Sequence, residues 1–144
     1  MGSPNGCLST ATPQFDAAST HGGPLTVPVI LCVDGEPDVL VSLRWVLTRE
    51  GFDVVTALDG EEALMCAQER TPDLIITDFT MTDMPGLELC SHLRSHRKTA
   101  HIPIILYTAL TPPATPHLYE SLCRKPGDLN GLASNIWTLL AVPD

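Results

Sequence analysis

Four polar residues of types that can carry out chemistry follow apolar runs in this chain. Two are carboxylates, one is a hydroxyl and one is an ammonium, a set that suits the transfer of a phosphoryl group to a carboxylate. Taken singly, an aspartate after a strand more often caps a helix or forms a turn, so the prediction depends on all four lying together. They are Asp34 after 29–33, Asp78 after 74–77, Thr108 after 102–107 and Lys125 after 122–124.

The apolar runs predict the element that would bring these residues together. Short continuous apolar runs are typical of parallel strands that helices cover on both faces. In such a sheet every strand presents its carboxyl end at one edge, and ligands bind at that edge. With a further short strand at 53–56, the alternation of strands and helices predicts an α/β fold with a doubly wound, five-stranded parallel sheet.

Local signals place the helices between these strands. Pro37 suits the first turn of a helix, and Gly51 stands where that helix would end. Asp59 and Gly60 open a second helix, whose first turn is acidic. A third carries apolar residues around 89–93, and Asp128 caps a fourth.

Composition narrows the class of protein. A chain of 144 residues with 44% hydrophobic residues can form one ordinary domain with a real core. A net charge of −9 disfavours a nucleic-acid surface, because such surfaces need clustered lysine and arginine. The five cysteines are scattered without a CxxC pair, which favours buried thiols in a reducing compartment. No membrane span or signal peptide is evident, so a cytoplasmic location is predicted.

The chain divides into two parts of different composition. Residues 1–28 contain no lysine or arginine and are rich in serine, threonine, glycine and proline. Such a segment has little to bury, so we expect a flexible N-terminal tail. Residues 29–144 carry the alternating pattern and are predicted to form the single folded domain.

Several motifs, taken in order, carry a resemblance to a known family. They are VILCVDGEPDV (29–39), DGEEAL (59–64), PDLIITDFTMTDMPGLEL (72–89), IPIILYTA (102–109) and CRKP (123–126). In order and spacing they resemble the receiver domain of bacterial two-component response regulators. The resemblance implies a flavodoxin-like, three-layer α/β/α fold.

The resemblance also implies a role for each polar residue. Asp78 would be the phosphoacceptor, and Asp78 and Lys125 would be the catalytic pair. Thr108 would be the switch hydroxyl, which with Lys125 binds the phosphoryl oxygens. Mg²⁺ would be held by Asp34, Asp78 and the backbone carbonyl of Thr80, with Glu36 as a further candidate ligand.

Two departures from the family pattern carry expectations of their own. The family has two adjacent acids after its first strand, whereas this chain reads Asp34-Gly35, so we expect weak Mg²⁺ binding. The segment between Thr108 and Lys125 is short and contains Pro112, Pro113 and Pro116. Proline in a helix interior costs roughly 3 kcal/mol, so a turn or loop is expected where relatives have a helix.

Two functions follow from these observations. In the first, the protein accepts a phosphoryl group at Asp78 from a histidine kinase or phosphotransfer protein and signals by binding a downstream protein. It would not be an independent enzyme and would at most catalyse its own phosphorylation and dephosphorylation. We expect a monomer, without nucleic acid or membrane as a partner. The alternative is a pseudo-receiver that binds proteins without being phosphorylated.

Overall fold

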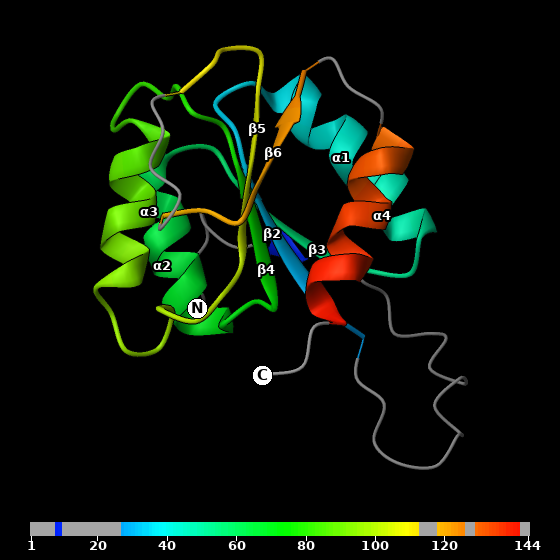
Figure 1. The fold of residues 1–144 in the computed structure, drawn as a ribbon, viewed down its shortest axis with the longest axis horizontal. Helices are drawn as coiled ribbons and strands as arrows, with labels where there is room; N and C mark the ends of the chain where they lie inside the picture. Colours follow the sequence, from blue (N-terminus) through cyan, green and yellow to red (C-terminus); the bar gives the residue numbers. More distant parts are fainter. Residues whose placement is uncertain (1–7, 10–26, 113–117, 126–128, 142–144) are drawn as a thin grey trace.

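The computed structural model describes residues 8–9, 27–112, 118–125 and 129–141, which form a three-layer α/β/α structure (Figure 1). Its sheet has six strands in the order β1-β3-β2-β4-β5-β6. The strands are β1 (Leu8–Ser9), β2 (Val29–Val33), β3 (Asp53–Ala57), β4 (Leu74–Thr77), β5 (Ile104–Thr108) and β6 (Ser121–Arg124). The helices are α1 (Pro37–Arg49), α2 (Gly60–Arg70), α3 (Gly86–Arg94) and α4 (Leu129–Leu140).

The five strands from β2 to β6 are parallel, which confirms the predicted fold class. Register aligns their carboxyl ends, since Val33 lies opposite Thr77 and Thr108 lies opposite Arg124. β5 begins at Ile104 rather than at Ile102, because Pro103 has no backbone N–H to donate to a neighbouring strand.

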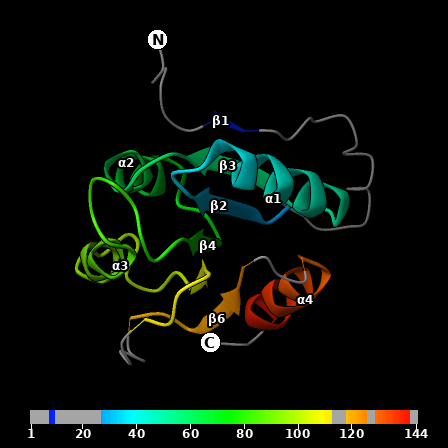
Figure 2. The same ribbon diagram turned by 90° about the horizontal axis from the view of Figure 1, so that it is seen from above.

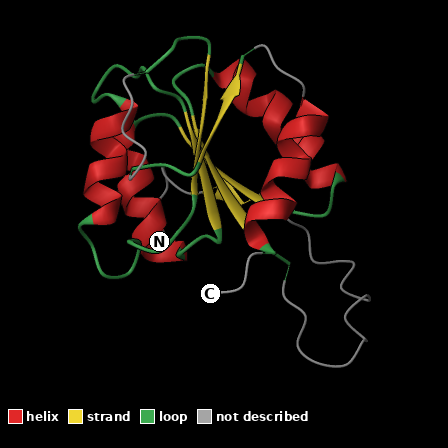
Figure 3. Ribbon diagram, in the orientation of Figure 1, coloured by secondary structure: helices red, strands yellow, loops and turns green. Residues whose placement is uncertain are grey.

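Helices cover both faces of the sheet (Figures 2 and 3). One core joins β2, β3, β4 and β5 to residues of α1 and α4, among them Leu43, Leu47 and Ile136. The other core lies on the opposite face and includes Ala63 of α2 and Leu89 of α3. Because the central strands are buried on both faces, their sequences read as continuous apolar runs.

Most of the residues predicted to begin or end a helix do so in the structure. Pro37 stands at the start of α1, and the Asp59 side chain accepts a hydrogen bond from the Glu62 amide at the start of α2. Gly51 follows α1 with a φ of 100°, a conformation that favours glycine. The predicted cap at Asp128 lies outside the described residues.

The N-terminal segment differs from the expected tail at one point. Leu8 and Ser9 form strand β1, which pairs antiparallel with Thr56 and Val55 of β3. This pairing gives partners to backbone groups that β3 would otherwise leave open as an edge strand. The prediction of a flexible tail was therefore wrong at these two residues, and the rest of 1–26 lies outside the described part of the chain.

The cysteines also differ from the prediction. Cys32, Cys90 and Cys123 are free, but Cys66 is disulfide-bonded, so the prediction of thiols only is wrong for Cys66. Burial raises the pKa of the Cys32 and Cys90 thiols to about 12, which leaves both protonated at neutral pH. Cys7 lies outside the described residues.

The connection from β5 to β6 contains no helix in its described residues, 109–112 and 118–120, in line with its prolines. Leu118 and Tyr119 pack instead against the core that α2 and α3 share with the sheet. Glu120 then fastens the segment, because its Oε1 accepts hydrogen bonds from the Ile104 amide at 2.7 Å and from Arg94 at 2.9 Å. Arg94 also donates to the carbonyl oxygens of Ala100 and Ile102.

This network predicts that Glu120 stabilises the fold. Glu120→Ala should lower the free energy of unfolding by about 1–3 kcal/mol, because the Ile104 amide loses its acceptor. Glu120→Gln keeps an acceptor oxygen and should lose less. Urea unfolding of both variants measures the difference, and equal stability of Glu120→Ala and the wild type would contradict the prediction.

Candidate functional site

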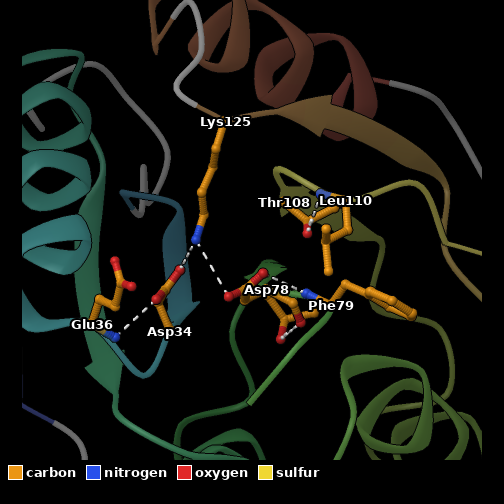
Figure 4. Close-up of polar contacts among 8 residues, drawn as sticks. Asp34, Glu36, Asp78, Phe79, Thr108, Leu110 and Lys125 are labelled. Carbon is orange, nitrogen blue, oxygen red and sulfur yellow. Dashed lines mark hydrogen bonds and ion pairs between the residues drawn. The ribbon is translucent and has the colours of Figure 1, made fainter.

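Three strand ends bring two carboxylates and one ammonium into contact (Figure 4). Asp34 follows β2, Asp78 follows β4 and Lys125 follows β6. The Nζ of Lys125 lies 2.6 Å from Oδ2 of Asp34 and 3.3 Å from Oδ2 of Asp78. One positive charge therefore bridges two negative ones at the carboxyl edge of the sheet.

The two carboxylates differ in accessibility. The side chain of Asp34 is 2% exposed, and its Oδ1 accepts a hydrogen bond from the Glu36 amide at 2.9 Å. The side chain of Asp78 is 14% exposed, and its Oδ1 accepts from the Phe79 amide at 2.7 Å. Asp34 is thus buried and held in place, while Asp78 is the carboxylate that a reagent from solution reaches more easily.

The surroundings of Lys125 favour the charged form of its side chain. Its burial alone would lower its pKa, but the hydrogen bond to Asp34 and the negative charges of Asp34 and Asp78 raise the pKa above its ordinary value. Lys125 also lies over the ring of Tyr107, with Nζ 5.7 Å from the ring centroid. The Lys125 amine is therefore protonated at neutral pH, and the resulting ammonium can contact anionic oxygens.

Thr108 is buried at the end of β5, and its position is set from two sides. Its carbonyl oxygen accepts a hydrogen bond from the Lys125 amide at 3.0 Å, which ties the ends of β5 and β6 together. Its hydroxyl accepts from the Leu110 amide at 3.2 Å. In Figure 4 Thr108 and Asp34 lie on opposite sides of Asp78, as the order of β2, β4 and β5 requires.

Two further residues were suggested as metal ligands, Glu36 and the backbone carbonyl of Thr80. Glu36 contacts Asp34 through its main-chain amide, while the residue itself is exposed at the start of α1. Thr80 is exposed in the loop after Asp78. Within the described part of the chain, no group of three acidic, histidine or cysteine side chains is placed to hold a metal ion.

Gly35 leaves room for the acid that the family pattern would place there. A Cβ at this position would meet only the carbonyl oxygen of Leu58, at 3.8 Å, which is an ordinary contact. Its φ also lies outside the left-handed region. The backbone therefore does not require glycine after Asp34.

Gly86, in contrast, must be glycine. A Cβ there would lie 2.1 Å from the carbonyl oxygen of Asp78 and 2.8 Å from the Cα of Phe79. The Gly86 amide donates to the Phe79 carbonyl oxygen at 2.6 Å, so the loop from Asp78 closes on the start of α3. The sequence analysis missed Asp83 in this loop, because its partners, the amides of Gly60 and Glu61, lie 23 and 22 residues earlier.

The fold and site together define a single α/β receiver module with an aspartate and lysine cluster at the carboxyl edge of its sheet. The family model of the response regulator receiver domain matches residues 30–118. The chain therefore belongs to the response regulator receiver domain family.

Relatives of known name agree with this assignment. The phosphate regulon transcriptional regulatory protein PhoB of Rhizobium meliloti is 45% identical over 83 residues, which are 58% of this chain and 37% of that protein. The alkaline phosphatase synthesis transcriptional regulatory protein PhoP of Bacillus subtilis is 42% identical over 80 residues, 56% of this chain and 32% of that protein. The match thus spans about a third of each relative.

Solved structures show the same fold over most of the chain. The chemotaxis response regulator CheY4 of Vibrio cholerae is 28% identical with a TM-score of 0.72, covering 79% of this chain and 99% of that chain. The response regulator TrrA of Thermotoga maritima, solved in complex with Mg²⁺-BeF, is 30% identical with a TM-score of 0.72, covering 78% and 99%. None of the described helices of this chain is long and apolar enough to cross a bilayer.

Gly86 provides a test of the loop geometry. Gly86→Ala should lower the free energy of unfolding by about 1–3 kcal/mol and displace the backbone of Asp78, because the added methyl group overlaps its carbonyl oxygen. Amide chemical shifts at Asp78 and Phe79 report the displacement.

Gly51→Ala is the matched control for this variant. It strains a positive φ far from the site at a cost of about 1–2 kcal/mol, yet it should leave the Asp78 and Phe79 shifts unchanged. If both variants perturb Asp78 equally, the contact between Gly86 and Asp78 does not control the site.

Proposed function

We propose that Asp78 accepts a phosphoryl group from a histidine kinase or phosphotransfer protein, and that the phosphorylated protein signals by binding a downstream protein. The observation that carries this proposal is the Lys125 ammonium, which lies between a buried carboxylate and a more accessible one. Family membership supports it, because receiver domains are the phosphorylated modules of response regulators.

The chemistry assigns a task to each side chain. An oxygen of Asp78 forms a bond to phosphorus as the bond from phosphorus to the donor nitrogen breaks, and that nitrogen keeps the electron pair. Lys125 contacts the phosphoryl oxygens and offsets their charge. A hydroxyl that accepts one hydrogen bond can still donate another, so Thr108 can donate to a phosphoryl oxygen and draw its loop toward Asp78.

The donor set also fits Mg²⁺. This ion prefers oxygen ligands and is usually bound through one or two carboxylates while it keeps several waters. Asp34 and Asp78 supply the two carboxylates, and the Thr80 carbonyl is the proposed third protein ligand. When bound, the ion supplies positive charge against the negative charge that develops during transfer. Because Gly35 carries no carboxylate, we propose that binding is weak.

The partners proposed for this chain are proteins. With a net charge of −9, the chain offers little attraction to a nucleic-acid backbone, although several relatives are named as transcriptional regulators. Those relatives are about three times as long as the matched region, so their other activities are not carried over. We propose a monomer that acts in the cytoplasm and has no enzymatic activity beyond its own phosphorylation and dephosphorylation.

Asp78→Asn tests the phosphoacceptor. Wild-type protein incubated with acetyl phosphate and Mg²⁺ should gain the mass of one phosphoryl group, and Asp78→Asn should gain none, because an amide is a poor nucleophile. Intact-mass spectrometry measures the gain. Asp38→Asn makes the same change at an exposed acid in α1 and should be labelled like the wild type. Labelling that persists in Asp78→Asn would show that Asp78 is not the phosphoacceptor.

Gly35→Asp tests the metal site. The added carboxylate should tighten Mg²⁺ binding by about 10–100-fold and speed phosphorylation of Asp78, since a direct ligand should matter at least as much as groups that orient ligands. Gly35→Ala adds a Cβ without a carboxylate and should bind as weakly as the wild type. Calorimetric titration compares the three proteins, and equal affinities of wild type and Gly35→Asp would contradict weak binding.

A further inference from the structure

The loop after Asp78 is fastened to a different part of the fold through one side chain. Asp83 lies between β4 and α3, and its carboxylate accepts hydrogen bonds from the Gly60 amide at 2.9 Å and the Glu61 amide at 3.0 Å. These amides belong to the first turn of α2, which already has a cap of its own, Asp59. Asp83 therefore caps the start of α2 and at the same time joins the loop after β4 to that helix.

Packing reinforces this attachment. A Cβ at Gly60 would lie 2.5 Å from Cγ of Met84, so the Met84 side chain rests directly on the backbone of α2. The loop is also fixed where it begins and ends. The Phe79 amide donates to the Asp78 carboxylate, and the Gly86 amide donates to the Phe79 carbonyl oxygen. Asp83 and Met84 hold the middle of the same loop against α2.

The charge of Asp83 suits this attachment. Asp83 is exposed, and its slight desolvation raises the pKa of its carboxyl group, but the hydrogen bonds from the Gly60 and Glu61 amides lower that pKa below its ordinary value. The start of a helix also favours a negative charge. The contact between loop and helix is therefore made by a carboxylate that stays ionised at neutral pH.

We infer that Asp83 is a positioning residue, which holds loop 79–85 against α2 so that the groups around Asp78 keep the geometry that binds Mg²⁺. This inference rests on the proposed function. Among the described contacts, Asp83 touches neither Asp78 nor Lys125, so it acts through the loop. Asp59 is the natural comparison, because it caps the same helix by accepting from the Glu62 amide at 2.8 Å but belongs to no part of that loop.

The test compares three variants with the wild-type chain by Mg²⁺ calorimetry, thermal unfolding and amide hydrogen exchange. Asp83→Ala and Asp59→Ala should lower the unfolding midpoint by similar amounts, since each removes a cap of α2. Asp83→Ala should weaken Mg²⁺ binding by about 10-fold, as removal of groups that orient metal ligands does. Asp59→Ala should leave the affinity unchanged. Asp83→Asn keeps one acceptor oxygen and should fall between Asp83→Ala and the wild type.

Amide hydrogen exchange tests the contact between Asp83 and α2 independently of Mg²⁺ binding. The Gly60 and Glu61 amides should lose protection in Asp83→Ala and keep it in Asp59→Ala. Equal Mg²⁺ affinities in Asp83→Ala and Asp59→Ala, with a wild type whose Mg²⁺ binding is measurable, would overturn this inference alone. A wild type that binds no Mg²⁺ would overturn the proposed metal site and this inference with it.

Discussion

The bridge from Lys125 to Asp34 and Asp78 is the interaction on which the rest of the site depends. Two carboxylates at adjacent strand ends repel each other, and the ammonium between them offsets that repulsion. Such a bridge requires that the ends of β2, β4 and β6 lie at one edge of the sheet, and the parallel order of these strands places them there. In the function we propose, the oxygens of a phosphoryl group take the place of a carboxylate as partners of Lys125.

The loops that surround this bridge are fixed by different means. Gly86 lets the loop after Asp78 return tightly to α3, and Asp83 fastens its middle to α2. On the other side of the site, the connection from β5 to β6 has no helix in its described residues, and Glu120 holds it through Arg94 and the Ile104 amide. In the described residues of this connection, a charged hydrogen-bond network rather than a helix holds the chain against the sheet.

The sequence predicted the parallel strands, and with them the placement of Asp34 and Asp78 at one edge of the sheet, because a strand buried on both faces reads as an apolar run and its carboxyl end is then known. It predicted α1 and α2 because Pro37 and Asp59 act locally. It did not predict β1, since two residues carry no periodicity and their partner strand lies more than 40 residues away. Asp83 and Glu120 were missed for the same reason: each accepts hydrogen bonds from donors in another segment, and only the folded chain brings the two segments together.

The most direct test of this account is a crystal structure of the wild-type protein with Mg²⁺ and beryllofluoride, which mimics a phosphoryl group. We expect beryllofluoride on Asp78, with Lys125 moved from Asp34 toward the fluorides and the Thr108 hydroxyl turned from the Leu110 amide toward a fluoride. A structure in which Asp78 stays unmodified under saturating reagent, with Lys125 still bridging Asp34 and Asp78, would contradict it. That result would mean that the ion pair is a permanent structural element and that the protein signals without phosphorylation.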